Sequence, residues 1–167
     1  MPTSSSETQS PAERREAESG LRDLIARHAP AHQRLIGTMR RWLLERVPTA
    51  WELAYEYTDW IVLSYSPNAN GYDGVLAIRA NADGVALYLS RGKELPDPLK
   101  LLKGSAKLVR FIPVERAATL KRPEVVALVA LAIAKNPLPF PRAGRGPLVI
   151  RSSKGEGKGA AKAKPSR

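Results

Sequence analysis

Apolar residues recur at helical spacing in the first third of the chain. They fall three or four positions apart within residues 21–28 and again within residues 30–47, which is the pattern of a helix with one apolar face. The positions are Leu21, Leu24 and Ile25, and then Leu35, Ile36, Met39, Leu43 and Val47. The sequence therefore predicts one helix ending near His28, before Pro30, and a second over residues 30–46.

From Trp51 onward the period changes to alternation, which is typical of strands. The expected strands are 51–57, 60–65, 74–80, 84–89 and 108–114. A third main helix is expected over residues 124–135, and residues 148–150 are a candidate for a short final strand. Two helices, a run of strands and a further helix predict an α+β fold, in which a mainly antiparallel sheet of about five strands is packed by helices.

The same patterns divide the chain into three parts. Residues 1–20 are polar and predicted to be largely disordered, although Ser10, Pro11 and Glu13 form a capping-box arrangement that favours a frayed helix. Residues 21–152 form the predicted α+β domain, and residues 153–167 form a basic, disordered tail. The expected core includes Leu43, Leu53, Ile78, Leu87, Phe111, Leu128 and Ile133.

Composition narrows the function classes. The chain has 167 residues and no cysteine, which rules out disulfides, thiolate zinc sites and a cysteine nucleophile. The N-terminus lacks the apolar segment of a signal peptide, and the longest apolar run, residues 125–134, is too short to span a membrane. We therefore expect a cytoplasmic protein without a membrane partner.

The net charge of +11 is unevenly distributed along the chain. It is −2 over residues 1–20, +6 over residues 21–138 and +7 over residues 139–167. Five cations of the tail could neutralise nucleic-acid phosphates without sequence preference. They are Lys154, Lys158, Lys162, Lys164 and Arg167. The alternative is a tail that only increases solubility.

Residues 91–110 contain the most informative motif. Gly92 interrupts the preceding strand, while Asp97 and Pro98 suit the start of a short helix over residues 98–103. Gly104 then stands where a left-handed helix cap is needed. Lys107 and Arg110 follow at the start of the next strand.

This segment resembles the YdhG-like family of bacterial domains, whose activity is unassigned. The resemblance rests on an ordered series of residues and extends over roughly residues 21–152. The series is Gly92, Leu95, Asp97, Pro98, Leu101, Leu102, Gly104, Lys107 and Arg110. It implies an α+β fold with an antiparallel sheet flanked by helices. One group of relatives is described as frataxin-like iron chaperones, so the resemblance also implies iron handling as a possible function. Ala106 departs from the family pattern, which often has a second glycine there.

The turn that follows the motif is a candidate anion site. Backbone N–H groups in a tight turn, together with two cations, suit a phosphate or a carboxylate. The predicted binding residues are Gly104, Ser105, Lys107 and Arg110, with Tyr55 nearby in a pocket between sheet and helices. The alternative is a helix cap followed by exposed cations. The turn does not match a P-loop.

Two weaker candidates concern metals. Glu52 and Glu56 share one face of the predicted first strand and, with Asp59, form the best set of oxygen ligands. A solvated strand face is the alternative. His28 and His32 have the spacing of helical metal ligands, but Pro30 between them disfavours that geometry.

Aromatic residues also group in the sequence. Trp42, Trp51 and Trp60 could line a cleft with Tyr55 and Tyr57, although aromatic residues at such spacings are more often part of a core. The chain shows no catalytic motif and no dinucleotide fingerprint, so no cofactor is predicted.

The leading hypothesis is a non-catalytic module that binds a small anionic ligand or a protein. The alternatives are nucleic-acid binding through the basic tail and metal handling.

Overall fold

The computed structural model describes residues 8–152, which form three α-helices and a six-stranded sheet. The helices are α1 (Pro11–Ile25), α2 (Pro30–Arg46) and α3 (Pro123–Lys135). The strands are β1 (Trp51–Glu56), β2 (Trp60–Ser66), β3 (Leu76–Asn81), β4 (Gly84–Leu89), β5 (Arg110–Val114) and β6 (Leu148–Ser152). Three short 3-10 helices lie in the connections, namely η1 (Gly71–Asp73), η2 (Gly92–Glu94) and η3 (Ala117–Lys121).

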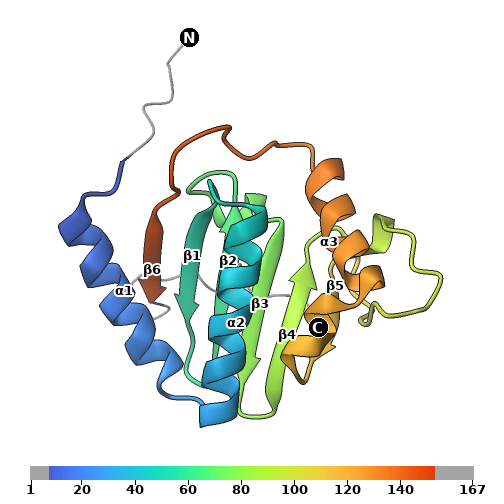
Figure 1. The fold of residues 1–167 in the computed structure, drawn as a ribbon, viewed down its shortest axis with the longest axis horizontal. Helices are drawn as coiled ribbons and strands as arrows, with labels where there is room; N and C mark the ends of the chain where they lie inside the picture. Colours follow the sequence, from blue (N-terminus) through green and yellow to red (C-terminus); the bar gives the residue numbers. More distant parts are fainter. Residues whose placement is uncertain (1–7, 153–167) are drawn as a thin grey trace.

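The sheet is open and its strand order is β5-β4-β3-β2-β1-β6. Strands β1 to β5 pair antiparallel in sequence order, whereas β6 pairs parallel with β1. The segment between α3 and β6 crosses one end of the sheet to reach the opposite edge (Figure 1). The predicted α+β class and the mostly antiparallel sheet are confirmed. The sheet is larger than the expected five strands because residues 148–152 form a complete edge strand.

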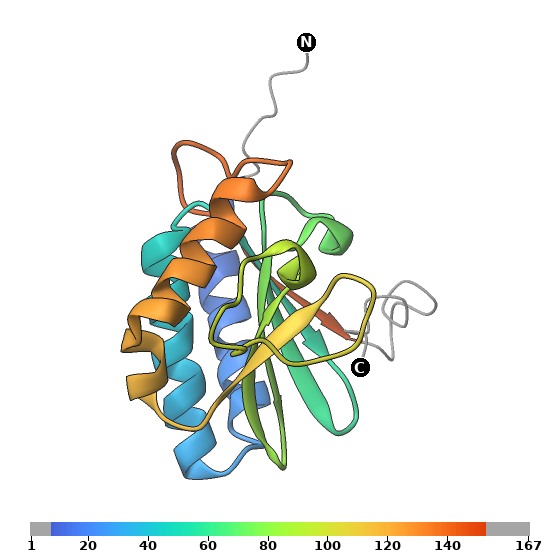
Figure 2. The same ribbon diagram turned by 90° about the vertical axis from the view of Figure 1, so that its right-hand side faces the viewer.

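All three helices cover the same face of the sheet (Figure 2). The main core lies between these two layers and includes Ile36 and Met39 of α2, Ile78 and Leu87 of the sheet, and Val125 of α3, all of which are fully buried. Within residues 8–152, no helix has both the length and the apolar composition needed to cross a membrane.

The predicted core is confirmed at most positions. The residues found buried are Leu43, Leu53, Ile78, Leu87 and Leu128. Phe111 and Ile133 are only partly buried. Phe111 lies on the opposite sheet face from the helices, which explains its partial exposure.

Helix α1 begins at Pro11, well before the domain boundary expected at residue 21. Both hydrogen bonds of the predicted capping box form, because Ser10 Oγ accepts from the Glu13 N–H and the Glu13 carboxylate accepts from the Ser10 N–H. The prediction that residues 1–20 are largely disordered is therefore wrong for residues 11–20. These residues are ordered because their charged side chains pack against the sheet, as described below.

The helix predicted over residues 98–103 is not present. Asp97 does accept two backbone hydrogen bonds, from the N–H groups of Leu101 and Leu102, at 2.8 Å each. However, Lys100 has a φ of 54°, in the left-handed region, which ends any helical turn. The segment is instead an irregular loop held by the Asp97 carboxylate.

Candidate functional site

The turn predicted as an anion site is held together by its own side chains. Arg110 Nη1 donates to the backbone oxygens of Ala106 and Val109. Gly92 lies against the Arg110 side chain, where an added Cβ would be 2.5 Å from the Arg110 Cβ. Gly104 has a φ of 112°, which a residue with a Cβ rarely adopts. The motif that resembles the YdhG-like family therefore has a structural role here. The Arg110 guanidinium donates to backbone carbonyl groups of the turn.

The predicted anion-binding residues do not come together. Ser105 and Lys107 are exposed in the turn that precedes β5. Tyr55 lies on β1, four strand spacings from β5, which is about 19 Å. Tyr55 also points to the sheet face without helices, where its hydroxyl accepts a 3.0 Å hydrogen bond from Arg151 Nη1. The predicted pocket between sheet and helices, combining Tyr55 with Lys107 and Arg110, is therefore wrong.

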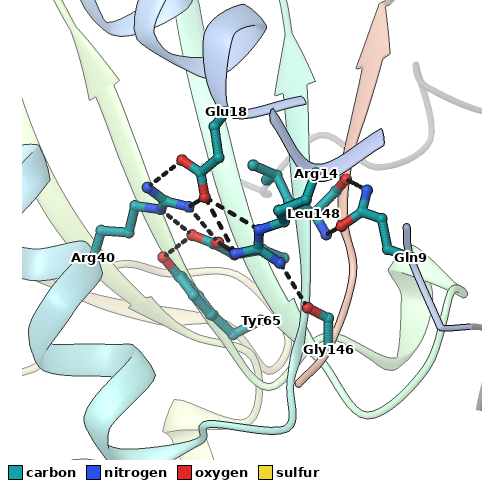
Figure 3. Close-up of polar contacts among 8 residues, drawn as sticks. Gln9, Arg14, Glu18, Arg40, Tyr65, Gly146 and Leu148 are labelled. Carbon is teal, nitrogen blue, oxygen red and sulfur yellow. Dashed lines mark hydrogen bonds and ion pairs between the residues drawn. The ribbon is translucent and has the colours of Figure 1, made fainter. Parts of the chain in front are cut away.

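Glu52 belongs to an ion cluster buried under α1 and α2 (Figure 3). Its carboxylate accepts from Arg40 Nε at 2.6 Å and Nη2 at 2.9 Å, and from the Tyr65 hydroxyl at 2.9 Å. Arg40 also donates two hydrogen bonds to Glu18, and Arg14 lies 3.8 Å from Glu52. Glu52 is only 1% exposed, so these partners satisfy a charge that burial would otherwise destabilise strongly.

The cluster shifts the pKa values of its members. Burial acts to raise the pKa of Glu18, but the hydrogen bond and charge of Arg40 outweigh it and hold that pKa below the ordinary value. Burial likewise acts to lower the pKa of Arg40, but hydrogen bonds to Glu52 and Glu18 raise it above the ordinary value. Burial and the nearby Glu52 raise the pKa of Tyr65 well above normal. Arg40 and Glu18 are therefore charged at neutral pH and held as a fixed pair.

The weak metal candidates do not converge on one site. Glu52 and Glu56 share a strand face, as predicted, but Glu56 pairs with Arg27 at 2.7 Å rather than with Glu52. His28 Nδ1 lies 3.3 Å from the Ile25 backbone oxygen. Within residues 8–152, no group of three or more His, Asp or Glu side chains is arranged to hold a metal ion. Glu52 and Glu56 form arginine pairs instead, and Asp59 lies in the wall of a cavity described below.

The sheet face without helices forms a second apolar cluster. The cluster consists of Leu53, Tyr55, Tyr57 and Val62, with Trp51, Trp60, Ala77 and Val149 packed against it. We call this surface the open sheet face. Strand pairing places on it Trp51, Leu53, Tyr55, Trp60, Val62, Ser64, Ser66, Ala77, Arg79, Asn81, Ala86, Tyr88, Phe111, Pro113, Val149 and Arg151. None of these strand positions carries an acidic residue.

Four rings and one guanidinium form a continuous stack across the open sheet face. Tyr57 stacks on Trp60 with ring centroids 4.0 Å apart and planes 9° from parallel. The Arg79 guanidinium carbon lies 4.3 Å from the Trp60 ring centre and 5.9 Å from that of Tyr88. Tyr88 in turn stacks on Phe111 at 5.0 Å. Contacts between cations and rings stabilise such an arrangement by about 0.5–2 kcal/mol each.

Arg79 is the charged group of this stack, and its guanidinium has few hydrogen-bond partners. Its Nη1 donates to the Tyr88 hydroxyl at 3.2 Å, but its Nε is buried and has no hydrogen-bond partner. No carboxylate in residues 8–152 forms an ion pair with Arg79 or with Arg151. Arg14 and Arg40 on the opposite face do pair with carboxylates. The open sheet face therefore carries uncompensated positive charge.

A cavity adjoins one end of the stack. Its volume is about 320 Å³, and Tyr57 and Trp60 contribute to its wall together with Arg27, His28 and Asp59 from the neighbouring turns. Burial, followed by the influence of Tyr55, raises the pKa of Tyr57 despite the opposing effect of Arg79. The Tyr57 phenol is therefore neutral at physiological pH. The end of the stack can accommodate a small group beside a neutral ring surface.

Sequence reasoning grouped part of this surface and missed its centre. Trp51, Trp60, Tyr55 and Tyr57 belong to one apolar cluster, but only Tyr57 and Trp60 line the adjoining cavity, and Trp42 lies on α2 beneath the Arg46 guanidinium. Arg79 was not singled out. The available signal was its position between the buried Ile78 and Ala80, which places it on the opposite face of a buried strand.

The tail cations Lys154, Lys158, Lys162, Lys164 and Arg167 lie outside the described residues. No family model matches the chain, and no curated protein or solved structure matches it either. The resemblance to the YdhG-like family stays a prediction from sequence.

Proposed function

We propose that this chain is a non-catalytic binding module that takes an anionic ligand on the open sheet face, with Arg79 as the central contact. The observation that carries the proposal is the state of Arg79: a partly buried guanidinium held between two rings, with no carboxylate partner in residues 8–152 and an unpaired Nε. A buried charge without a counter-charge is destabilising. An anion bound at this position would remove that cost.

The surroundings of Arg79 favour the same ligand chemistry. The rings of Trp60 and Tyr88 fix the orientation of the guanidinium, so little side-chain entropy remains to be lost on binding. A second cation on this face is Arg151, which lies in the same cross-strand row. No acidic residue occupies the strand positions of the face, so no strand side chain there repels an anion.

The YdhG-like assignment is part of this proposal. It is supported by the structural roles of Gly92, Asp97, Gly104 and Arg110, which together hold the loop before β5. On this view the motif maintains the fold and does not contact the ligand. The proposal therefore moves the binding site from the 104–110 turn to the centre of the sheet.

Titration of the full-length protein with inorganic tripolyphosphate tests the proposal. In NMR spectra we expect the Arg79 Nε–H and the Trp60 indole N–H signals to shift, because both groups lie at the site. We expect Arg79→Met to weaken this binding about tenfold or more, since a hydrogen bond to a charged group contributes about 1.5–3 kcal/mol. The methionine keeps an apolar stem between the two rings.

The matched control is Arg34→Met, which removes the same charge from an exposed position on α2, in the layer covering the other face. This variant is expected to bind tripolyphosphate like the wild type. Unchanged affinity in Arg79→Met, or signal changes confined to Lys107 and Arg110, would refute the site. Thermal unfolding of both variants separates loss of binding from loss of folding.

A further inference from the structure

The open sheet face presents a ring or a guanidinium from every strand of the sheet. In the spatial order of the strands, these side chains are Phe111, Tyr88, Arg79, Trp60, Tyr55 and Arg151. Six strands span about 24 Å at the usual strand spacing. This series of side chains, which spreads over three neighbouring cross-strand rows, is too long for one small anion, and it suits an extended polymer that carries both rings and negative charges.

We propose that the ligand of this face is a single-stranded nucleic acid that runs across the strands, an inference that rests on the proposed function. Phosphates would contact Arg79 and Arg151, the two arginines of the row. Bases would contact the partly exposed rings of Trp60 and Phe111. Stacking of bases on aromatic side chains, combined with cations along the backbone, is the general basis of binding to single strands.

The rings of this face differ in exposure, and we assign them different roles in binding accordingly. Tyr55 and Tyr88 are 5% and 8% exposed, so they form the floor of the surface and orient the two arginines through their hydroxyl groups. Trp60, Phe111, Arg79 and Arg151 are partly exposed. Open sheets that bind RNA elsewhere use the same division between exposed rings and a supporting sheet.

Charge and ring content favour a single strand over other anionic polymers. A duplex hides the faces of its bases, so the rings would be left without partners. An acidic peptide would match the arginines but would have no bases to stack on Trp60 and Phe111. The face is free of acidic residues at its strand positions, and the whole chain carries a net charge of +11, both of which favour phosphate-rich partners.

Fluorescence anisotropy of the full-length protein with labelled oligonucleotides of about 10 nucleotides tests the inference. The probes are an oligo-uridine RNA and an oligo-thymidine DNA, compared with polyphosphate, poly-glutamate and a duplex. We expect both single strands to bind at least about tenfold more tightly than any of the other three, and to quench tryptophan fluorescence, because their bases can stack on the exposed rings. Comparing RNA with DNA shows which sugar is preferred.

Two variants assign the effect to the open sheet face. Phe111→Leu is expected to weaken binding of the single strands about tenfold or more, while leaving tripolyphosphate binding at Arg79 within about twofold, because it removes a stacking ring that is not one of the two rings holding Arg79. Arg79→Met is expected to weaken both and to reduce the salt dependence of oligonucleotide binding by about one phosphate contact. Trp42→Leu, on α2 beneath Arg46, is the control and should change neither.

The outcomes separate this inference from the proposed function. Equal affinity for oligonucleotides and polyphosphate, with Arg79 still required, would overturn the nucleic-acid inference and leave the anion site intact. Preference for poly-glutamate would indicate an acidic protein partner and overturn it as well. Oligonucleotide binding that survives both Phe111→Leu and Arg79→Met would place the contact elsewhere in the chain. A protein that binds none of these probes, tripolyphosphate included, would refute both proposals.

Discussion

Two glutamates on the same face of β1 differ sharply in environment. Glu52 is 1% exposed and accepts hydrogen bonds from Arg40 and Tyr65. Glu56 pairs with Arg27 at 2.7 Å, but these two side chains are 23% and 54% exposed. Removing one partner of a buried pair is costly, because the remaining charge stays buried without compensation, whereas an exposed pair contributes little.

We therefore predict that Glu52→Ala lowers the free energy of unfolding by about 3–5 kcal/mol. The matched variant Glu56→Ala should lower it by about 1 kcal/mol or less. Urea unfolding followed by circular dichroism measures both. Similar costs for the two variants would mean that the buried cluster does not stabilise the fold as the contacts suggest.

This pair also shows what the sequence could not reveal at the residue scale. Alternation along β1 correctly placed Glu52 and Glu56 on one face. The partners of Glu52, however, come from α2 and α1, and Arg40 lies 12 positions away in the chain. Nothing in local spacing indicates that a carboxylate will meet an arginine from a packed helix, so a solvated face and a metal site seemed the only alternatives.

The loop before β5 is maintained by single backbone positions. Gly104 has a φ of 112°, next to the two hydrogen bonds that join Lys103 to Phe111. For a residue with a Cβ, such a conformation costs about 1–3 kcal/mol of folding free energy. We predict that Gly104→Ala lowers the free energy of unfolding by about that amount, measured by urea unfolding.

Gly84 at the start of β4 provides the control for this prediction. An added Cβ there would meet no atom within 4 Å, so Gly84→Ala should be neutral or slightly stabilising. If Gly104→Ala were equally harmless, the loop would not depend on the left-handed backbone. Tripolyphosphate binding by Gly104→Ala should match the wild type, because the proposed site lies on the open sheet face.

At the scale of elements, the periodicity of apolar residues predicted most helices and strands. Two predictions were wrong, the start of the first helix and the helix over residues 98–103, and each has a specific cause. The segment before residue 21 was expected to be at most a frayed helix because it is polar and includes charged residues such as Arg14 and Glu18. In the structure they point into the ion cluster instead. The helix expected over residues 98–103 had the correct cap in Asp97, yet Lys100 adopts a left-handed backbone that no propensity rule assigns to lysine.

For the whole molecule, the two faces of the sheet differ in whether their arginines have carboxylate partners. The covered face pairs Arg14 and Arg40 with carboxylates, while the open face leaves Arg79 and Arg151 without them in residues 8–152. The sequence predicted the α+β class and most of the core, but it could not predict which strand positions would lie beneath helices. That choice depends on where the helices pack, which is set by contacts between distant residues such as the hydrogen bond from Arg14 of α1 to the Gly146 backbone oxygen, 132 positions away.

The covered face also makes folding stability depend on pH. Arg40 holds the pKa of Glu18 below its ordinary value of 4.5 in the folded protein. The unfolded chain therefore binds a proton at Glu18 before the folded protein does as pH falls, and protonation favours unfolding. This contribution to stability is complete above the unfolded pKa and is lost as pH falls through the lowered folded value.

We predict that the urea midpoint of the wild type declines between about pH 5 and pH 2.5, and that Glu18→Gln declines less over this range, because glutamine has no proton to gain. At pH 7 the variant should already be less stable than the wild type, since it has lost the charge that faces Arg40. The two stability curves should therefore converge toward acid pH. Parallel curves would mean that Glu18 titrates alike in both states, and that the bridge from α1 to Arg40 contributes nothing to holding the helical layer on the sheet.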